Sequence, residues 1–199
     1  MRKGGLYLAI GDSITWTIPS ETNPKGANLY ASRIQKAINE NYSPIRHVNK
    51  GIGGAVAAGI VINLPWLSRL NPDLITIGVG MNDCAGGVGN VTNYKNDLRT
   101  IIDKFRLRNP NVHIILCTPS RTTDANRTPY IQAFRDAMIE VATEKNTGLC
   151  RFDNAWASAD DATYLPDAVH PTSAGHQKLF DVLWTEVQKG EWLQRLIED

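Results

Sequence analysis

The chain has 199 residues, of which 42% are hydrophobic, and it carries 21 lysines and arginines against 20 aspartates and glutamates. This near-neutral balance argues against nucleic acid as the main partner, because phosphate binding needs a basic face. The composition also excludes disordered and collagen-like classes. Three cysteines without a C-x-x-C pair are not typical of a disulfide framework or a zinc site, so we expect free thiols and no metal.

Short apolar runs alternate with helical patterns along the whole chain. In chain order, the first half predicts a strand at Leu6–Ile10, a helix at Ala27–Asn39, a strand at Ile45–Asn49, a helix at Ala55–Leu70 and a strand at Leu74–Val79. The second half predicts a helix at Val91–Arg108, a strand at Val112–Cys117, a helix at Thr128–Lys145, a strand at Leu149–Asp153 and a helix at Thr172–Ile197. Pro65 must kink or split the second helix, Pro129 suits the first turn of the fourth, and Gly190 is a candidate interruption of the last.

Alternating strands and helices with right-handed crossovers predict a parallel sheet with helices on both faces. We therefore expect an α/β fold, a three-layer α/β/α sandwich with a five-stranded parallel sheet in the flavodoxin-like order 2-1-3-4-5. The length favours one domain over residues 1–199. Ligands of such sheets bind beyond the carboxyl ends of the strands, so the segments that follow the strands are the candidates for a functional site.

Four of these segments carry polar or glycine-rich sequence. They are Gly11–Thr15 after the first strand, Asn49–Gly54 after the second, Gly80–Asp83 after the third, and Asp167–Pro171 in the long loop after the fifth. They lie far apart in the sequence, but the predicted topology brings them to one rim of the sheet.

These segments supply the groups needed for nucleophilic acyl transfer. Ser13 lies at a strand end that opens a helix, where negative charge is favoured. His170 is the best placed of four histidines to act as its base, and Asp167, three residues earlier, can orient the imidazole. The N–H groups of Ser13 and Gly54 and the amide of Asn82 are candidates for an oxyanion hole.

Other aspartates compete with Asp167 for the role of third member. Asp12 is better suited to bind neighbouring backbone and hold the nucleophile turn, and Asp83 is expected to do the same around Asn82. The Asp160–Asp161 pair is interpreted as solvated.

The sequence resembles the SGNH hydrolases, the GDSL-type esterase and lipase superfamily. Gly11-Asp12-Ser13 is similar to the first block of that family, Asn49–Gly54 to the second, Gly80–Asp83 to the third block G-x-N-D, and Asp167–Pro171 to the last block D-x-x-H-P. The blocks occur in order and span residues 11 to 176, nearly the whole chain. Ile14 stands where the family pattern has leucine, and Trp16 stands where many members have a small residue, which leaves the substrate open.

The resemblance implies a serine esterase without metal or cofactor that hydrolyses short-chain acyl esters through an acyl-enzyme. A small acyl ester or an acetylated carbohydrate is the expected substrate, with carbohydrate O-deacetylation first. A lysophospholipase or thioesterase acting on longer acyl chains would use the same residues. An alternative of a different class is a non-catalytic flavodoxin-like binding module, but the phosphate-binding G-x-x-x-x-G-K-[ST] and a complete G-x-G-x-x-G are absent from the sequence. The G-x-S-x-G elbow of the α/β-hydrolases is absent too.

No run approaches the ~18 apolar residues of a membrane span, and the apolar run near the N-terminus is too short for a signal peptide. We expect a soluble protein, cytoplasmic as the sequence stands, with export of a longer precursor left open. Trp16 and Trp156 are expected in the core or at its rim. A homo-oligomer is left open, because four apolar residues near the C-terminus are candidates for contact with a second subunit, namely Trp192, Leu193, Leu196 and Ile197.

Overall fold

The computed structural model describes residues 5–16 and 28–195. A parallel sheet in the order β2-β1-β3-β4-β5 forms its centre, which confirms the predicted topology. The strands are β1 (Leu6–Gly11), β2 (Arg46–Gly51), β3 (Leu74–Gly78), β4 (His113–Cys117) and β5 (Gly148–Cys150). Every residue of β1, an interior strand between β2 and β3, is buried, as expected of a strand covered on both faces.

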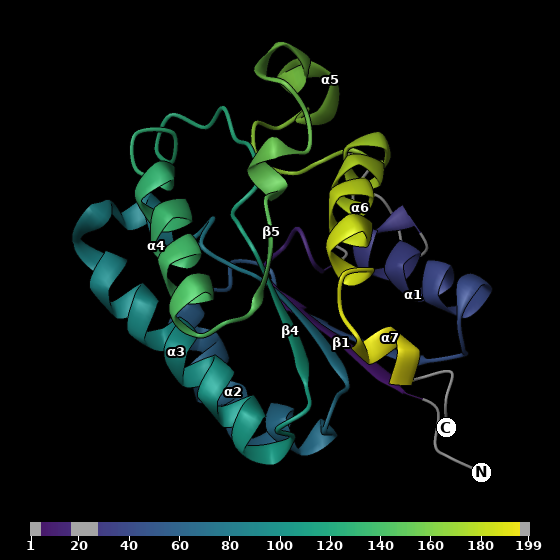
Figure 1. Ribbon diagram of the computed structural model, residues 1–199. Helices are drawn as coiled ribbons and strands as arrows, with labels where there is room; N and C mark the ends of the chain where they lie inside the picture. The colour runs from purple at the N-terminus through teal and green to yellow at the C-terminus, as the bar shows by residue number, and fades with distance from the viewer. Residues whose placement is uncertain (1–4, 17–27, 196–199) are drawn as a thin grey trace.

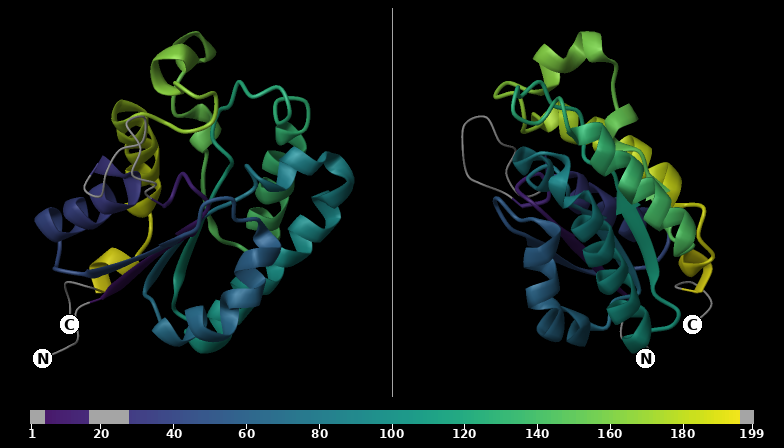
Figure 2. Two further views of the ribbon diagram at one scale, coloured as in Figure 1. Left: turned by 180° about the vertical axis from the view of Figure 1, so that it is seen from behind. Right: turned by 90° about the vertical axis from the view of Figure 1, so that its left-hand side faces the viewer.

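Helices cover both faces of the sheet (Figures 1 and 2). The helices are α1 (Tyr30–Asn41), α2 (Ala57–Leu67), α3 (Val91–Arg108), α4 (Ile131–Glu144), α5 (Asp161–Tyr164), α6 (Ser173–Val187) and α7 (Trp192–Arg195). On one side α2, α3 and α4 pack in sequence, and on the other α1 packs against α6. No helix in residues 5–16 and 28–195 is long and apolar enough to cross a membrane.

The ends of three strands are level with one another. In the sheet register Gly11 of β1 pairs with Gly51 of β2 and with Gly78 of β3. The loops that follow these strands therefore begin side by side, although they are separated by tens of residues in the sequence. This alignment places the first three of the four predicted segments at one rim.

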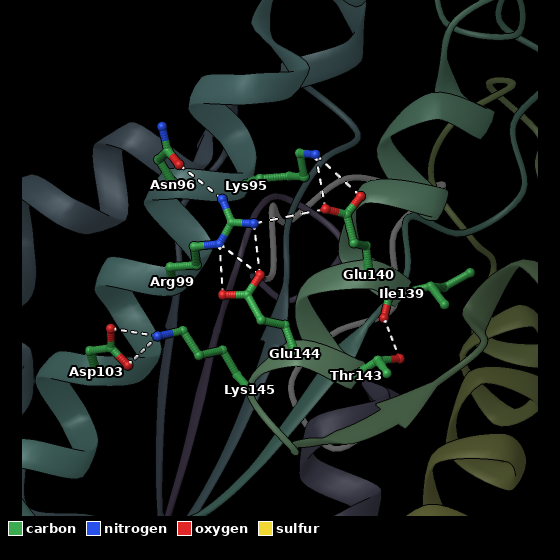
Figure 3. Close-up of polar contacts among 9 residues, drawn as sticks. All are labelled: Lys95, Asn96, Arg99, Asp103, Ile139, Glu140, Thr143, Glu144 and Lys145. Carbon is green, nitrogen blue, oxygen red and sulfur yellow. Dashed lines mark hydrogen bonds and ion pairs between the residues drawn. The ribbon is translucent and has the colours of Figure 1, made fainter.

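Ion pairs connect the exposed sides of α3 and α4. Figure 3 shows basic residues of α3 facing acidic residues of α4, with one pair of reversed polarity at the end of the row. The pairs are Lys95–Glu140 at 3.1 Å, Arg99–Glu144 at 2.7 Å and Lys145–Asp103 at 2.8 Å. Because these charges are exposed to solvent, they add little stability and mainly fix how the two helices lie against each other.

Two predicted helices differ from the structure at their ends. The helix predicted from Thr128 begins at Ile131, and Pro129 lies in the turn before it. A residue before proline is disfavoured in the α conformation, which is why the helix starts only after Pro129. The terminal helix ends at Val187 and resumes as α7, with Gly190 in the break.

The break after α6 folds Trp192 and Leu193 back onto the protein. Trp192 and Leu193 are buried, and the Trp192 indole N–H donates to the carbonyl of Val187 at 3.2 Å. These two residues belong to the core, so the prediction that they contact a second subunit is wrong. Leu196 and Ile197 lie outside the described residues.

The remaining elements follow the sequence closely. Pro65 lies inside α2, which ends two residues later and continues as the 3-10 turn η2 (Ser68–Leu70). The fifth strand ends at Cys150, before the predicted Asp153, because residues 152–154 form the 3-10 turn η5. All three cysteines are buried and free, as predicted.

Candidate active site

A tight turn after β1 presents Ser13. The carboxylate of Asp12 accepts a hydrogen bond from the N–H of Ile14 at 2.9 Å, and its carbonyl accepts from the N–H groups of Thr15 and Trp16 at 3.1 and 3.0 Å. Asp12 therefore holds the turn, as the sequence predicted. Burial raises the pKa of the Asp12 carboxyl to about 7.

Glycines give the Ser13 turn room to pack on the sheet. A Cβ on Gly11 would lie 2.1 Å from the hydroxyl of Thr15, and a Cβ on Gly51 would lie 2.4 Å from the backbone nitrogen of Trp16. The amide of Asn49 then donates to the carbonyl of Thr15 at 2.7 Å. The end of β2 thus contacts the Ser13 turn directly. In the second sequence block, Asn49–Gly54, the asparagine as well as the glycines therefore supports this turn.

Ser13, His170 and Asp167 form a continuous chain of hydrogen bonds. Ser13 Oγ lies 2.8 Å from His170 Nε2, and His170 Nδ1 lies 2.7 Å from Asp167 Oδ2. The other oxygen of Asp167 accepts from the backbone N–H groups of Val169 and His170 at 3.1 and 2.7 Å. Burial opposes ionisation of Asp167, but these hydrogen bonds outweigh it and hold its pKa below the usual value.

The loop that carries His170 is fixed on both sides. Ala168 has φ +70°, a left-handed conformation that is unfavourable for a residue with a side chain. Its carbonyl accepts from the hydroxyl of Thr122 at 2.7 Å and the N–H of Thr123 at 3.0 Å. On the other side the Thr172 side chain caps α6 by accepting a hydrogen bond from the N–H of Gly175. These contacts hold an otherwise strained loop in place.

The three residues predicted to supply N–H donors, Ser13, Gly54 and Asn82, line one pocket. Gly54 has φ +74°, and a Cβ at that position would meet no atom within 4 Å. The Asn82 amide donates to the carbonyl of Ala55 at 3.0 Å, which orients the group and leaves its second hydrogen. Among the described residues, none accepts a hydrogen bond from the N–H of Ser13 or Gly54.

A pocket of about 330 Å³ brings the predicted residues together. It is lined by Ser13, Gly53, Gly54, Asn82, Arg127, Asp167, Val169 and His170. The five residues predicted for the reaction and its oxyanion hole therefore share one cavity, whose mixed charges and donors suit a polar ester.

Asp83 differs in detail from the prediction. It accepts a hydrogen bond from the N–H of Ala57 at 3.0 Å and so fixes the start of α2, rather than only the backbone around Asn82. Its second oxygen is buried and has no hydrogen-bond partner among the described residues. Burial raises the pKa of this carboxyl to about 6.

Asp161 is not solvated, so the interpretation of the Asp160–Asp161 pair is wrong for this residue. It is buried and binds the Arg121 guanidinium through both oxygens at 2.6 and 2.8 Å. The indole N–H of the buried Trp156 donates to it at 2.9 Å. Asp161 thus anchors the segment between β5 and His170. The sequence around Asp161 does not indicate this ion pair, because Arg121 lies forty residues away.

Sequence reasoning also missed Arg127, which comes from the loop between β4 and α4. Its Nε donates to the carbonyl of Met81 at 3.1 Å, and its side chain lines the pocket over Ser13. The only signal available in the sequence was topological, since the carboxyl end of β4 must meet the same rim as the other strands.

A second hollow of about 350 Å³ lies at the β2 edge, beside Trp16. Three large apolar side chains at its lining are exposed, Trp16 by 43%, Ile52 by 51% and Trp66 by 41%. The Lys50 ammonium lies 4.9 Å from the centre of the Trp66 ring. We refer to this hollow as the β2-edge groove.

The sequence profile of the GDSL-like Lipase/Acylhydrolase family matches residues 9–178. Among solved structures, the chain is similar to Axe2, an acetylxylan esterase from Geobacillus stearothermophilus, with 25% identity, a TM-score of 0.76, and coverage of 95% of this chain and 96% of that one. It is similar to TesA with 25% identity, a TM-score of 0.77, and coverage of 92% and 98%. The psychrotrophic esterase EstA from Pseudoalteromonas shares the fold, with 19% identity, a TM-score of 0.75, and coverage of 96% and 99%. No curated protein matches the sequence.

Proposed function

The chain belongs to the GDSL-like lipase/acylhydrolase family, and on that premise we propose that it is a serine esterase that hydrolyses short-chain acyl esters through an acyl-enzyme. The observation that carries the proposal is the pair of hydrogen bonds linking Ser13, His170 and Asp167, at 2.8 and 2.7 Å, inside one pocket. In this proposal Ser13 is the nucleophile, His170 the general base and acid, and Asp167 the group that orients the imidazole.

The first half of the reaction forms the acyl-enzyme. A carboxylate can only accept from the imidazole, so Asp167 keeps the proton on His170 Nδ1 and leaves the lone pair of Nε2 facing the Ser13 hydroxyl. As Oγ attacks the ester carbonyl carbon, its proton passes to Nε2. When the carbon–oxygen bond to the alcohol breaks, the same proton passes from Nε2 to the departing alcohol oxygen.

The second half returns the enzyme to its starting state. A water molecule loses a proton to His170 Nε2 as its oxygen attacks the acyl carbon. The acid is released when the bond to Ser13 Oγ breaks and Oγ regains the proton. In both halves the carbonyl oxygen gains negative charge, which the N–H groups of Ser13 and Gly54 and the Asn82 amide are proposed to stabilise.

Acetylated carbohydrate is the proposed substrate class for this reaction. The likeness to an acetylxylan esterase at 25% identity over 95% of the chain supports it. The pocket over Ser13 supports it as well, because glycines and polar groups make up most of its lining and suit a small acyl group with a polar alcohol.

A fluorophosphonate probe tests the proposal most directly, because it reacts with an activated serine and not with an ordinary one. We expect covalent labelling of the wild-type protein at Ser13, found by mass spectrometry of its peptides. Ser13→Ala should lose both labelling and hydrolysis of 4-nitrophenyl acetate, with an unchanged circular dichroism spectrum. A folded wild-type protein that is not labelled would instead favour a non-catalytic binding module.

The β2-edge groove favours a second candidate, hydrolysis of esters with longer acyl chains. The alcohol oxygen must face His170, and the carbonyl oxygen must face Gly54 and Asn82, so the acyl group extends to the remaining side of Ser13. The groove lies by the β2 edge, whereas the loop carrying His170 follows β5 at the opposite edge. Its apolar walls would bind a chain at about 0.8 kcal/mol for each buried methylene.

A series of 4-nitrophenyl esters from acetyl to octanoyl separates the two candidates. A groove that holds the chain raises kcat/KM by up to about fourfold per methylene, and Trp66→Ala should flatten that rise. Ile62→Ala is the matched control, because Ile62 is an exposed apolar residue of the same helix that does not line the groove. Values that fall with chain length in the wild type, together with release of acetate from acetylated xylooligosaccharides, favour the first candidate.

A further inference from the structure

Among the described residues that line the pocket over Ser13, Arg127 is the only lysine or arginine. Its guanidinium is held on two sides. Nε donates to the carbonyl of Met81 at 3.1 Å, and Nη1 lies 3.0 Å from Asp124 Oδ1. Asp124 is itself fixed, because the same oxygen accepts from the N–H of Asn126 at 3.0 Å. The guanidinium is therefore positioned before any substrate arrives, which lowers the entropy cost of binding to it.

Most donors of this guanidinium are not used within the protein. Arginine has five N–H groups, and in the described part of the chain only Nε, which donates to Met81, and Nη1, which pairs with Asp124, have a protein partner. The side chain is 21% exposed, so its terminal nitrogens are partly removed from water at the pocket wall. Partly desolvated donors without a protein acceptor are suited to a ligand that supplies one.

The loop that carries Arg127 also contacts the loop that carries His170, because Thr122 and Thr123 donate two hydrogen bonds to the carbonyl of Ala168, two residues before His170. His170 Nε2 must face the alcohol oxygen in order to protonate it. We infer that a substituent on the alcohol extends from His170 toward Arg127, since both residues line the same pocket.

We propose that Arg127 selects esters whose alcohol portion carries a carboxylate. This inference rests on the function proposed above and names the chemistry of its substrate. A guanidinium matches a carboxylate with two parallel N–H···O bonds, and such charge-assisted pairs are stronger than neutral hydrogen bonds. Nη2 and the remaining hydrogen of Nη1 supply the two donors, while Asp124 keeps its own contact with Nη1.

Two acetyl esters that differ only in charge provide the test, 4-acetoxybenzoate and 4-acetoxybenzamide. We expect the wild type to prefer the benzoate in kcat/KM by about tenfold or more, after correction for the spontaneous hydrolysis of each ester. Arg127→Gln should abolish this preference, and Arg127→Lys, which keeps the charge without the fork, should retain part of it. High salt should reduce the preference of the wild type.

Arg108→Gln is the matched control for loss of one positive charge, because Arg108 is exposed at the far end of α3 and should leave the preference unchanged. Equal rates on the two esters in the wild type would overturn the inference. So would an Arg127→Gln variant that loses activity on both esters with an unchanged ratio, because Arg127 would then act only by positioning Met81 and the Asn82 loop. In both cases labelling of Ser13 would leave the proposed function intact, whereas a wild type that is not labelled and hydrolyses neither ester would contradict that function.

Discussion

Asp167 uses its two oxygens for different purposes. Oδ2 accepts from the imidazole of His170, whereas Oδ1 accepts from the backbone N–H groups of Val169 and His170. The second set of bonds closes the loop on itself and fixes which oxygen faces the ring. Any side chain that replaces Asp167 must therefore still accept the hydrogen bonds from the N–H groups of Val169 and His170.

Asp167→Asn is expected to keep the fold and lower kcat by roughly 10³–10⁴-fold. The amide oxygen takes over the backbone N–H groups, so the NH₂ is left facing His170 Nδ1 and selects the tautomer with the proton on Nε2. That proton then faces Ser13 in place of a lone pair. Asp160→Asn is the control, since Asp160 is an exposed residue of the same segment. Activity close to wild type in Asp167→Asn would mean that another group orients His170.

Asn82→Ala is expected to lower kcat by roughly 10²–10³-fold and to change KM far less. The reason is that the amide meets full negative charge only in the transition state. Steady-state kinetics with 4-nitrophenyl acetate measure both constants, and Asn93→Ala provides a nearby exposed asparagine as control. A loss confined to KM would assign Asn82 to ground-state binding.

The site residues that the sequence predicted are those whose role depends on local spacing. The position of Ser13 at a strand end and that of Asp167 three residues before His170 can both be read from the linear sequence. Arg127 and Asp161 were missed, because each acts through a partner about forty residues away and no local pattern marks it. The strand topology predicted that the site lies at the carboxyl-end rim of the sheet, but it did not predict which side chains reach that rim.

At the scale of elements, the strands were predicted well because most of them are short apolar runs bounded by polar or glycine-rich segments, although β2 is largely polar. Right-handed crossovers limit the possible strand orders, and 2-1-3-4-5 is one of the common orders for such sheets, so the order was predictable too. Helix ends were less accurate. The start of α4 depends on how Thr128 and Pro129 form a turn, and the end of α6 depends on the Trp192 indole packing back on the chain. Such contacts are tertiary and leave no periodic signal.

Two glycines in neighbouring elements should respond in opposite ways to alanine. Gly51→Ala forces a Cβ to within 2.4 Å of the Trp16 backbone, so it should displace the Ser13 turn and reduce kcat severely. Gly59→Ala adds a Cβ within α2 that meets no atom within 4 Å, so it should stabilise the protein by about 0.5–1 kcal/mol. Urea unfolding and kcat measured on both variants check this. An active Gly51→Ala enzyme would show that the close approach of β2 to the turn is not required.

At the scale of the whole molecule, two buried groups should shape the pH dependence of stability from opposite sides. Burial lowers the pKa of His176 from 6.5 to about 3, and burial raises that of Asp12 from 3.8 to about 7. Between pH 3 and 6.5 the unfolded state binds the proton of His176 and the folded state does not, so this contribution falls as the pH falls. Between pH 4 and 7 the folded state binds the proton of Asp12, so that contribution falls as the pH rises.

Relative to His176→Gln, we therefore expect the free energy of unfolding of the wild type to fall by about 1.4 kcal/mol per pH unit below pH 6. Relative to Asp12→Asn, it should fall as the pH rises from 4 to 7. Urea unfolding at half-unit steps of pH measures both differences. Parallel curves for the wild type and a variant would mean that the replaced group does not titrate differently on unfolding.

The ends of β1, β2 and β3 are level, so the pocket residues fall into two groups, those on loops that follow these three strands and those on loops that follow β4 and β5. The turn that presents Ser13 and the loops with Gly54 and Asn82 grow from one hydrogen-bonded frame, whose register fixes Gly11 against Gly51 and Gly78. His170 and Arg127 come from loops beyond that frame. Under the proposed function, insertions after β4 or β5 would change which alcohol is accepted while the acyl carbon keeps its surroundings. Under the proposed mechanism, the strand frame would carry the nucleophile and the oxyanion donors, and the two outer loops would carry the base and the side chain that meets the alcohol.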